Sequence, residues 1–301
     1  MKRIFSILLV VALLCAVCFC AVACNDDEQP KEFERVTTLD KEPDALFGKD
    51  KAFALMDKAT NFSVEYTTKE GDEQSAGIAK LVLDTTEKEN FVSVYANGSM
   101  KDDEGVVNSI AYMFLTWEEN RKGDMEKTLV SVSSFSGGDV DEEPIWDAYT
   151  ENELESSVGA PIKAYHKSLI ANCGANHGTR YIREEIYNQN DDVYDTIKAS
   201  MKEIYSDEAL TNLVRTEITI TYSYLNDEEK AVNGTATIVL ENKEVDFVDG
   251  QNATALVITS ITIVEEGGYN LNAKYTYGVY SLDAPTEENY LTSWPEAYPL
   301  S

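Results

Sequence analysis

The chain contains few of the residues that most often perform chemistry in proteins. Its 301 residues include two histidines, and four of its five cysteines fall within the first 24 positions. Beyond that point there is a single cysteine, Cys173, so no disulfide can form within the remainder. The sequence has no H-E-x-x-H, G-x-S-x-G, S-x-x-K, Walker or G-x-G-x-x-G pattern. These absences exclude the easily recognised metalloprotease, serine hydrolase, P-loop and dinucleotide-binding classes.

Positive charge is also scarce, because 25 Lys and Arg residues oppose 54 Asp and Glu residues and leave a formal net charge of −29. Nucleic-acid binding depends on cationic side chains that displace counterions from phosphates. Nucleic acid is therefore not expected as a partner, and the sequence indicates no cofactor.

The first 24 residues form the most distinctive segment. A basic start, Met1-Lys2-Arg3, precedes an apolar run over residues 4–23, and polar residues follow Cys24. A basic n-region, an apolar h-region and small residues before a cleavage point are typical of a secretory signal. Ala21-Val22-Ala23-Cys24 resembles the lipobox of bacterial lipoproteins. The resemblance implies that residues 1–23 are removed and that Cys24 is the lipidation site, receiving a diacylglyceryl group.

The alternative for this segment is an uncleaved signal anchor, since roughly 20 apolar residues can also span a bilayer. Both interpretations place the body outside the cytoplasm, held at the outer face of a bacterial cell membrane. Without residues 1–23, which include two basic and no acidic side chains, 23 basic side chains oppose 54 acidic ones, a net charge of −31. We therefore expect an acidic, extracytoplasmic lipoprotein whose membrane contact is the Cys24 lipid.

Composition divides the chain into five segments. Residues 1–23 are the predicted signal peptide, and the polar residues 24–42 are predicted to be a lipidated flexible tether. A helix-plus-five-strand unit is expected over 43–136 and a unit of helices plus five strands over 151–301. The acidic residues 137–150 are interpreted as the linker between them.

Hydrophobic periodicity predicts the elements of these two units. In the first unit we expect a helix over 44–59, strands over 62–67, 79–84, 91–96, 110–117 and 127–135, and turns at Gly71-Asp72 and Asn97-Gly98. In the second unit we expect helices over 151–158, 161–172 and 191–205, strands over 179–187, 217–224, 233–241, 253–264 and 271–280, and a hairpin turn at Gly267-Gly268.

This order predicts an α+β fold in which antiparallel curved sheets, about ten strands in total, have helices packed on one face. A helix that leads into residues 61–66 and a last strand that leads into residues 281–285 resemble the half-barrel family that includes the periplasmic lipoprotein carrier. The resemblance implies two half-barrel-like units in tandem, and it transfers no functional residue.

Three residues could supply nucleophilic or metal-binding chemistry. His166 and Cys173 share one predicted helix, and His177 follows four residues after the cysteine. A Cys–His pair could act as nucleophile and base or contribute to a metal site. Ordinary packing at a helix end explains the same residues, so neither a catalytic residue nor a metal ligand is assigned.

Two acidic segments could bind a cation. Residues 188–192 alternate oxygen ligands as a calcium loop does, but Val193 stands where Gly is needed and Ala199 where the closing Glu is needed. A helix N-cap explains the same segment. A solvated linker is the favoured role of four further acidic residues, namely Asp139, Asp141, Glu142 and Glu143.

Aromatic side chains are the remaining candidates for recognition. Tyr222 and Tyr224 are expected on one sheet face and Tyr275 and Tyr277 on another, where most would pack in the core. A concave sheet lined by Ile and Tyr could hold an apolar or carbohydrate ligand.

The function expected from these patterns is a non-enzymatic binding or carrier module for an apolar or amphipathic ligand, whose binding residues are not assigned. One alternative is an interaction or envelope-regulatory module whose partner is an envelope protein. A second alternative is a glycan or cell-wall hydrolase that uses paired carboxylates.

Overall fold

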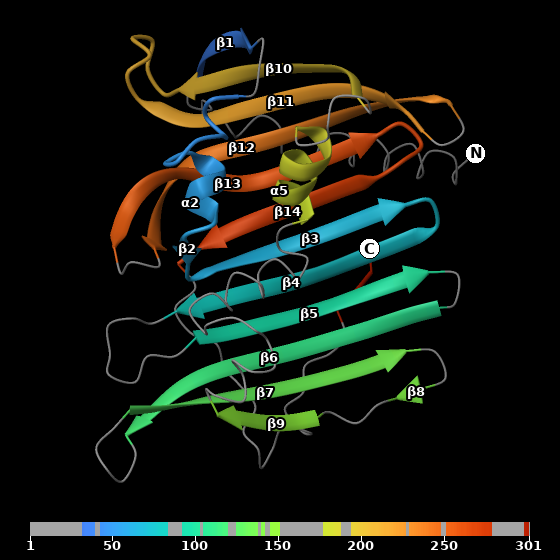
Figure 1. The fold of residues 1–301 in the computed structure, drawn as a ribbon. Helices are drawn as coiled ribbons and strands as arrows, with labels where there is room; N and C mark the ends of the chain where they lie inside the picture. The colour runs from blue at the N-terminus through green and yellow to red at the C-terminus, as the bar shows by residue number, and fades with distance from the viewer. Residues whose placement is uncertain are drawn as a thin grey trace, which may run out of the picture.

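A single antiparallel sheet dominates the molecule (Figure 1). The computed structural model describes residues 32–39, 43–83, 92–102, 105–119, 125–137, 140–141, 145–150, 177–187, 194–226, 229–247, 251–278 and 298–300. Fourteen strands in these ranges belong to one sheet, and all their pairings are antiparallel. The antiparallel character predicted from the sequence is therefore confirmed.

The strands are mostly long, and they are β1 (Phe33–Leu39), β2 (Ala59–Thr60), β3 (Phe62–Glu70), β4 (Glu73–Leu83), β5 (Val92–Asp102), β6 (Gly105–Glu119), β7 (Met125–Gly137), β8 (Val140–Asp141), β9 (Ile145–Thr150), β10 (Tyr194–Tyr205), β11 (Leu213–Leu225), β12 (Ala231–Phe247), β13 (Asn252–Glu265) and β14 (Asn270–Tyr277). Their spatial order is β1-β10-β11-β12-β13-β14-β3-β4-β5-β6-β7-β8, with β2 beside β12 and β9 beside β7.

Three pairings join segments that are far apart in the chain, and one of them is the short pairing of β2 with β12. Strand β14 pairs with β3, and β1 pairs with β10 along its whole length (Figure 1). The remaining neighbours are mostly hairpins of consecutive strands. Strands from both expected units therefore share one sheet, which continues across the β14–β3 junction.

Short helical elements lie on one face of the sheet, over β12, β13 and β14 (Figure 1). They are α2 (Ala52–Met56), α5 (His177–Arg180) and one π-helical segment, η1 (Tyr181–Ile186). Phe53, Ile182 and Ile186 from these elements are buried in one cluster with the alternate residues of the strands beneath them. Within the described ranges, no helix is long and apolar enough to cross a membrane.

Local chemistry accounts for the tight connections. Gly71 and Gly267 both have a positive φ, +59° and +74°, which a residue without a Cβ adopts at no steric cost. They lie in the turns between β3 and β4 and between β13 and β14. The two turns predicted at Gly71-Asp72 and Gly267-Gly268 are thus confirmed, whereas Asn97-Gly98 lies inside β5.

The helix predicted over 44–59 is much shorter than expected. Residues 44–50 form turns, and α2 covers only Ala52–Met56. Leu46 is fully buried although it lies outside the helix, because the turn directs it into the same core as Phe53 and Met56. Burial alone therefore produced the apolar spacing that suggested a longer helix.

Two predictions in the second half were wrong in opposite directions. Residues 179–187, predicted as a strand, form helical turns in which the buried Ile182 and Ile186 are four residues apart. Residues 194–205, predicted as part of a helix over 191–205, form strand β10. Ile197, Ala199 and Met201 also fit a two-residue alternation, and pairing with β1 and β11 selects that period.

The predicted flexible tether over 24–42 contains a strand. Residues 33–39 form β1, whose backbone pairs with β10, so the tether prediction was wrong for this part. Strands β8 and β9 likewise fall within the acidic segment 137–150. The predicted signal peptide, Cys24 and the helices expected over 151–158 and 161–172 lie outside the described residues.

Candidate binding face

The two faces of the sheet differ sharply in chemistry. Along β12, Ala236, Ile238 and Leu240 are fully buried against the helical elements, and the residues between them point to the opposite side. We call the buried side the core face and the opposite side the polar face. Strands β11, β13, β14 and β3 show the same alternation, so the polar face extends across them.

A row of hydroxyl and amide side chains crosses the polar face. Direct register partners connect one residue from each of seven neighbouring strands. These residues, the hydroxyl row, are Thr38, Ser200, Thr219, Thr237, Thr262, Asn272 and Thr67. Neighbouring strands lie about 4.8 Å apart, so the row presents hydrogen-bonding groups at nearly regular intervals.

Two hollows adjoin at the β14–β3 end of this row. The first, of about 300 Å³, is lined by Thr67, Thr262 and Asn272 together with neighbouring side chains of β14, β3 and β4. The second, of about 830 Å³, is lined by Asn272 and by residues of β12, β13 and β14, including Ser260. Because Asn272 lines both, we treat them as one groove, the polar groove. It crosses five strands, or roughly 19 Å at the usual strand spacing.

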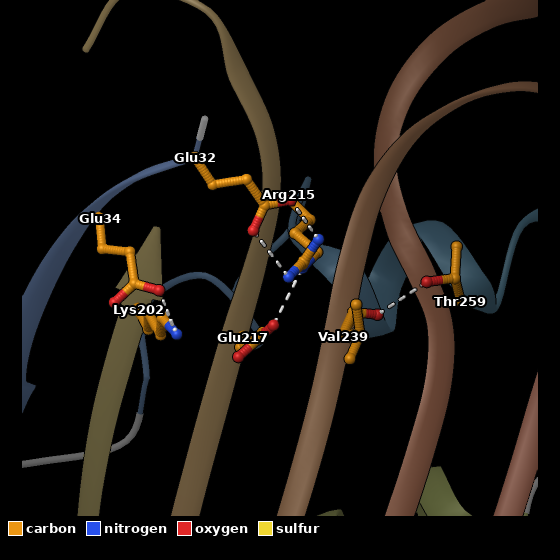
Figure 2. Close-up of polar contacts among 7 residues, drawn as sticks. All are labelled: Glu32, Glu34, Lys202, Arg215, Glu217, Val239 and Thr259. Atoms are coloured by element: carbon orange, nitrogen blue, oxygen red, sulfur yellow. Dashed lines mark hydrogen bonds and ion pairs between the residues drawn. The ribbon is translucent and has the colours of Figure 1, made fainter. Parts of the chain in front are cut away.

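The second hollow lies where the pairing of β12 and β13 is irregular. The register shifts between Val239 and Leu240, so β13 has one extra residue, Thr259, at this point. The Thr259 hydroxyl donates a long hydrogen bond of 3.4 Å to the Val239 carbonyl (Figure 2). Both residues line the second hollow. The bulge thus places an additional hydroxyl group beside the groove.

The formal charge of the polar groove is opposite in sign to the net charge of the whole chain. Its lining contains three lysines, Lys69, Lys243 and Lys274, and two acids, Glu241 and Glu244. One acid is neutralised within the groove, because the Lys243 ammonium lies 2.6 Å from a Glu241 carboxylate oxygen. The lining therefore carries a formal charge of +1, in a protein with a net charge of −29.

Lys69 and Lys274 differ from Lys243 in having no ionic partner among the described residues. Both are exposed, and neither forms an ion pair with any residue that the structure describes. Glu65 is the register partner of Lys274, yet it does not line either hollow. The two ammonium groups flank the Asn272–Thr67 pair, two residues away along β14 and β3 in opposite directions.

Cations at the β1 edge of this side of the sheet are paired. At the β1 edge, Arg215 donates to both carboxylate oxygens of Glu32 over 2.9 and 3.2 Å, and to Glu217 over 2.9 Å (Figure 2). Lys202 lies 2.6 Å from Glu34, and this hydrogen bond raises the pKa of the lysine. These ion pairs link β1 to β10 and β11, whereas Lys69 and Lys274 of the polar groove have no such partner among the described residues.

A short segment near the end of the chain lies over one end of the groove. The Ser99 hydroxyl donates a hydrogen bond of 2.5 Å to the Tyr298 carbonyl, and Leu300 lines the first hollow. Burial and the nearby Glu65 carboxylate raise the pKa of Tyr298. Residues 298–300 thus border the groove at its β4 end.

Glu265, at the end of β13, is a buried carboxylate on the core face. It is 4% exposed and accepts hydrogen bonds from the hydroxyls of Tyr181, Tyr222 at 2.8 Å and Tyr224 at 3.0 Å. The backbone N–H of Tyr269 donates a fourth, at 3.2 Å. The carboxylate is therefore fully solvated by protein donors, and it ties η1 to β11 and to the β13–β14 turn.

Two glycines make room for this arrangement. A Cβ on Gly234 would lie 2.2 Å from the Tyr222 ring, and a Cβ on Gly268 would lie 2.8 Å from a Glu265 carboxylate oxygen. Tyr222 and Gly234 are direct register partners, so the ring lies across the neighbouring strand at the one position without a side chain. The Glu265 cluster therefore fixes the positions of η1, β11 and the β13–β14 turn relative to one another.

The tyrosines singled out from the sequence all belong to the core face. Tyr222 and Tyr224 bind Glu265, while the Tyr277 hydroxyl donates to the Ile258 carbonyl over 2.7 Å. Tyr275 is buried beside Tyr277 on β14. The expectation that the two pairs occupy different faces was wrong, because one sheet contains both strands and their registers are in phase.

The other predicted candidates do not converge on a site. Cys24, His166, Cys173 and the segments 188–193, 138–139 and 142–144 lie outside the described residues. His177 begins α5, and Ala199 is buried in β10. Across the described ranges, no group of three or more His, Cys, Asp and Glu residues could hold a metal ion.

Sequence reasoning missed both Glu265 and the polar groove. The signal for Glu265 was its place in the apolar alternation of β13, two residues after Ile263 and directly before Glu266 and Gly267-Gly268. The groove had no local signal, because its residues come from strands that the sequence does not place side by side. Comparison with known protein families, with curated proteins and with solved structures found no match to this chain.

Proposed function

We propose that the protein is an exported, lipid-anchored binding module of the bacterial cell surface, and that the polar face is its binding surface. The basic and apolar leader and the Ala-Val-Ala-Cys sequence support export and attachment through Cys24. The same proposal makes the protein non-enzymatic and gives it an envelope component as partner. It corresponds to the interaction module among the functions considered from the sequence.

The observation that carries the proposal is the position of the polar groove. On the core face, the space beneath α2 and η1 is filled by side chains such as Leu46, Ile182 and Ile238, each fully buried. An apolar ligand held between the sheet and these helices would have to displace them. On the polar face, the two hollows are unfilled, and hydrogen-bonding side chains form part of their lining. The arrangement favours a polar partner over an apolar cargo.

The proposed anchor is compatible with this arrangement. Eight residues lie between Cys24 and Phe33, the first residue of β1, and the nine residue steps from one to the other span roughly 30 Å even when fully extended. The β1 edge would therefore remain close to the membrane. The short helices over one face of an antiparallel sheet are the feature that supports a half-barrel-like character for the fold.

Amine acetylation of the protein in isolated envelopes tests the binding face. Lys69, Lys243 and Lys274 of the groove are expected to be protected relative to the purified protein. Lys49 and Lys51, exposed beside α2, serve as internal controls and should react equally in both samples. Mass spectrometry of the labelled peptides gives the ratio at each lysine.

A groove-filling variant separates binding from shielding by the membrane. Asn272→Trp places a large ring between the two hollows at an exposed strand position. If a partner binds in the groove, protection of the groove lysines should disappear in this variant. If the membrane alone covers the face, the protection should persist. Equal labelling of envelope and purified protein would refute the proposal.

The anchor has a test of its own. A Cys24→Ala variant should stay unprocessed, lack the mass of the diacylglyceryl group and leave the membrane fraction or remain there as a longer precursor. An unchanged mature mass would show that Cys24 is not the lipidated residue. Native mass spectrometry after gentle extraction provides the mass, and it would also reveal any apolar ligand that the protein retains.

A further inference from the structure

We propose that the polar groove binds a linear, anionic polyol polymer, a chain of sugar or polyol units that carry carboxylate or phosphate groups. The inference rests on the proposed function and specifies the chemical class of the partner. It follows from three properties of the groove: its charge, its hydrogen-bonding groups and its position in the interior of the sheet.

Charge selects an anionic ligand. The groove lining has a formal charge of +1, while the whole chain has a charge of −29. A polyanion is repelled by most of the surface and finds in this groove two ammonium groups, those of Lys69 and Lys274, that no described residue neutralises. The two lysines stand on opposite sides of Asn272, so a chain lying through the groove passes both.

Hydrogen-bonding capacity selects a polyol. Thr67, Gln74, Thr262, Asn270 and Asn272 line the first hollow, and hydroxyls and amides both donate and accept. A chain of sugar or polyol units offers the same dual capacity on every unit. The hydroxyl row supplies such groups at about 4.8 Å per strand, a spacing similar to the length of one pyranose ring.

Position in the sheet excludes the usual mode of peptide recognition. A peptide strand adds to an exposed sheet edge and uses its backbone hydrogen bonds for affinity. Strands β12, β13, β14, β3 and β4 each pair with neighbours on both sides, so no free backbone edge borders the groove. The apolar residues of the lining, which include Tyr275 and Tyr277, alternate with hydroxyl, amide and charged residues, so the groove offers no continuous apolar surface.

The test measures binding of three purified polymers to the full mature chain. Hyaluronate carries carboxylates, a glycerol-phosphate polymer carries phosphates, and dextran is uncharged. We expect one or both polyanions to bind, dextran to bind at least tenfold more weakly, and the affinity to fall with added salt because screening weakens exposed charge contacts.

Paired variants assign the binding to the groove. The double variant Lys69→Gln/Lys274→Gln should lower the affinity about 2- to 30-fold, the range expected for two exposed charge pairs. The matched control Lys49→Gln/Lys51→Gln removes the same charge on the other side of the sheet and should change it less than twofold. Asn272→Trp should abolish binding.

Several outcomes would overturn the inference. Equal binding of dextran and the polyanions would show that charge does not select the ligand, and equally tight binding of poly-glutamate would show that hydroxyl groups do not. Polyanion binding that survives Asn272→Trp would place the site elsewhere. Absence of polyanion binding, together with lysine protection in envelopes, would refute this ligand class and leave the proposed function intact.

Discussion

The two faces of this sheet are made by the same strands and yet have opposite roles. On β12, Ile238 is fully buried on the core face, and the preceding Thr237 belongs to the hydroxyl row of the polar face. The core face gains stability from apolar burial, at about 25 cal/mol per Å². The polar face contributes little to folding and keeps its hydrogen-bonding groups near solvent. Adjacent residues of one strand therefore contribute to different properties: one to stability and the next to the proposed recognition.

Adjacent substitutions on one strand should reveal this separation most strongly. Ile238→Ala removes a fully buried side chain and leaves a cavity, so the free energy of unfolding should fall by about 2–5 kcal/mol. Thr237→Ala should change it by about 0.5 kcal/mol or less. Urea denaturation of both variants measures the difference. Similar losses would show that the polar face also stabilises the fold.

A glycine on the core face should give the next largest effect. In Gly234→Ala the new Cβ would lie 2.2 Å from the Tyr222 ring, which must move away from Glu265. We expect a loss of about 1–3 kcal/mol of unfolding free energy, as for other overpacked sites. In a Tyr222→Ala background the same change should cost much less. A cost that is independent of Tyr222 would show that the clash is not its cause.

High pH should weaken the core face through its tyrosines. Burial raises the pKa of Tyr275 and of Tyr277 well above the ordinary value of 10.0, and for Tyr277 the neighbouring Tyr275 adds to the effect. The unfolded chain loses these protons near pH 10, whereas the folded protein retains them. Stability is thus fully present below pH 10 and falls as the pH rises further.

Absorbance and unfolding measured together check this prediction. The signal of these two tyrosinates should appear only with unfolding, and Tyr275→Phe should reduce the steepness of the loss. If both tyrosines ionised near pH 10 while the protein remained folded, the result would contradict the burial that the structure shows.

The smallest effect is expected at the β1 edge. Arg215→Gln removes the contacts with Glu32 and Glu217, which are partly exposed, so the unfolding free energy should fall by about 0.2–1 kcal/mol. High salt should remove most of this difference, because screening weakens exposed ion pairs. A salt-independent loss would indicate that Arg215 acts through packing of its stem.

Regular alternation made some elements predictable and left others ambiguous. Strand β11 was predicted well because Ile218, Ile220 and Tyr222 alternate with polar residues and fit no helical period. Strand β10 was mistaken for a helix because its apolar residues satisfy both periods. In no case did the sequence predict which distant residue a side chain would contact. Nothing near Tyr222 in the sequence indicates that its hydroxyl binds Glu265, 43 residues away.

The sequence by itself determined the acidic charge, the apolar run that precedes Cys24, and the alternation that creates two unlike faces, since each is a property of composition or of near neighbours. Only the tertiary structure decided which strands meet. The β14–β3 junction brings Lys69 and Lys274 to one groove from positions 205 residues apart, and the β1–β10 pairing turns an expected tether into an edge strand. The reason is physical: pleating is local, whereas pairing depends on registers between distant segments.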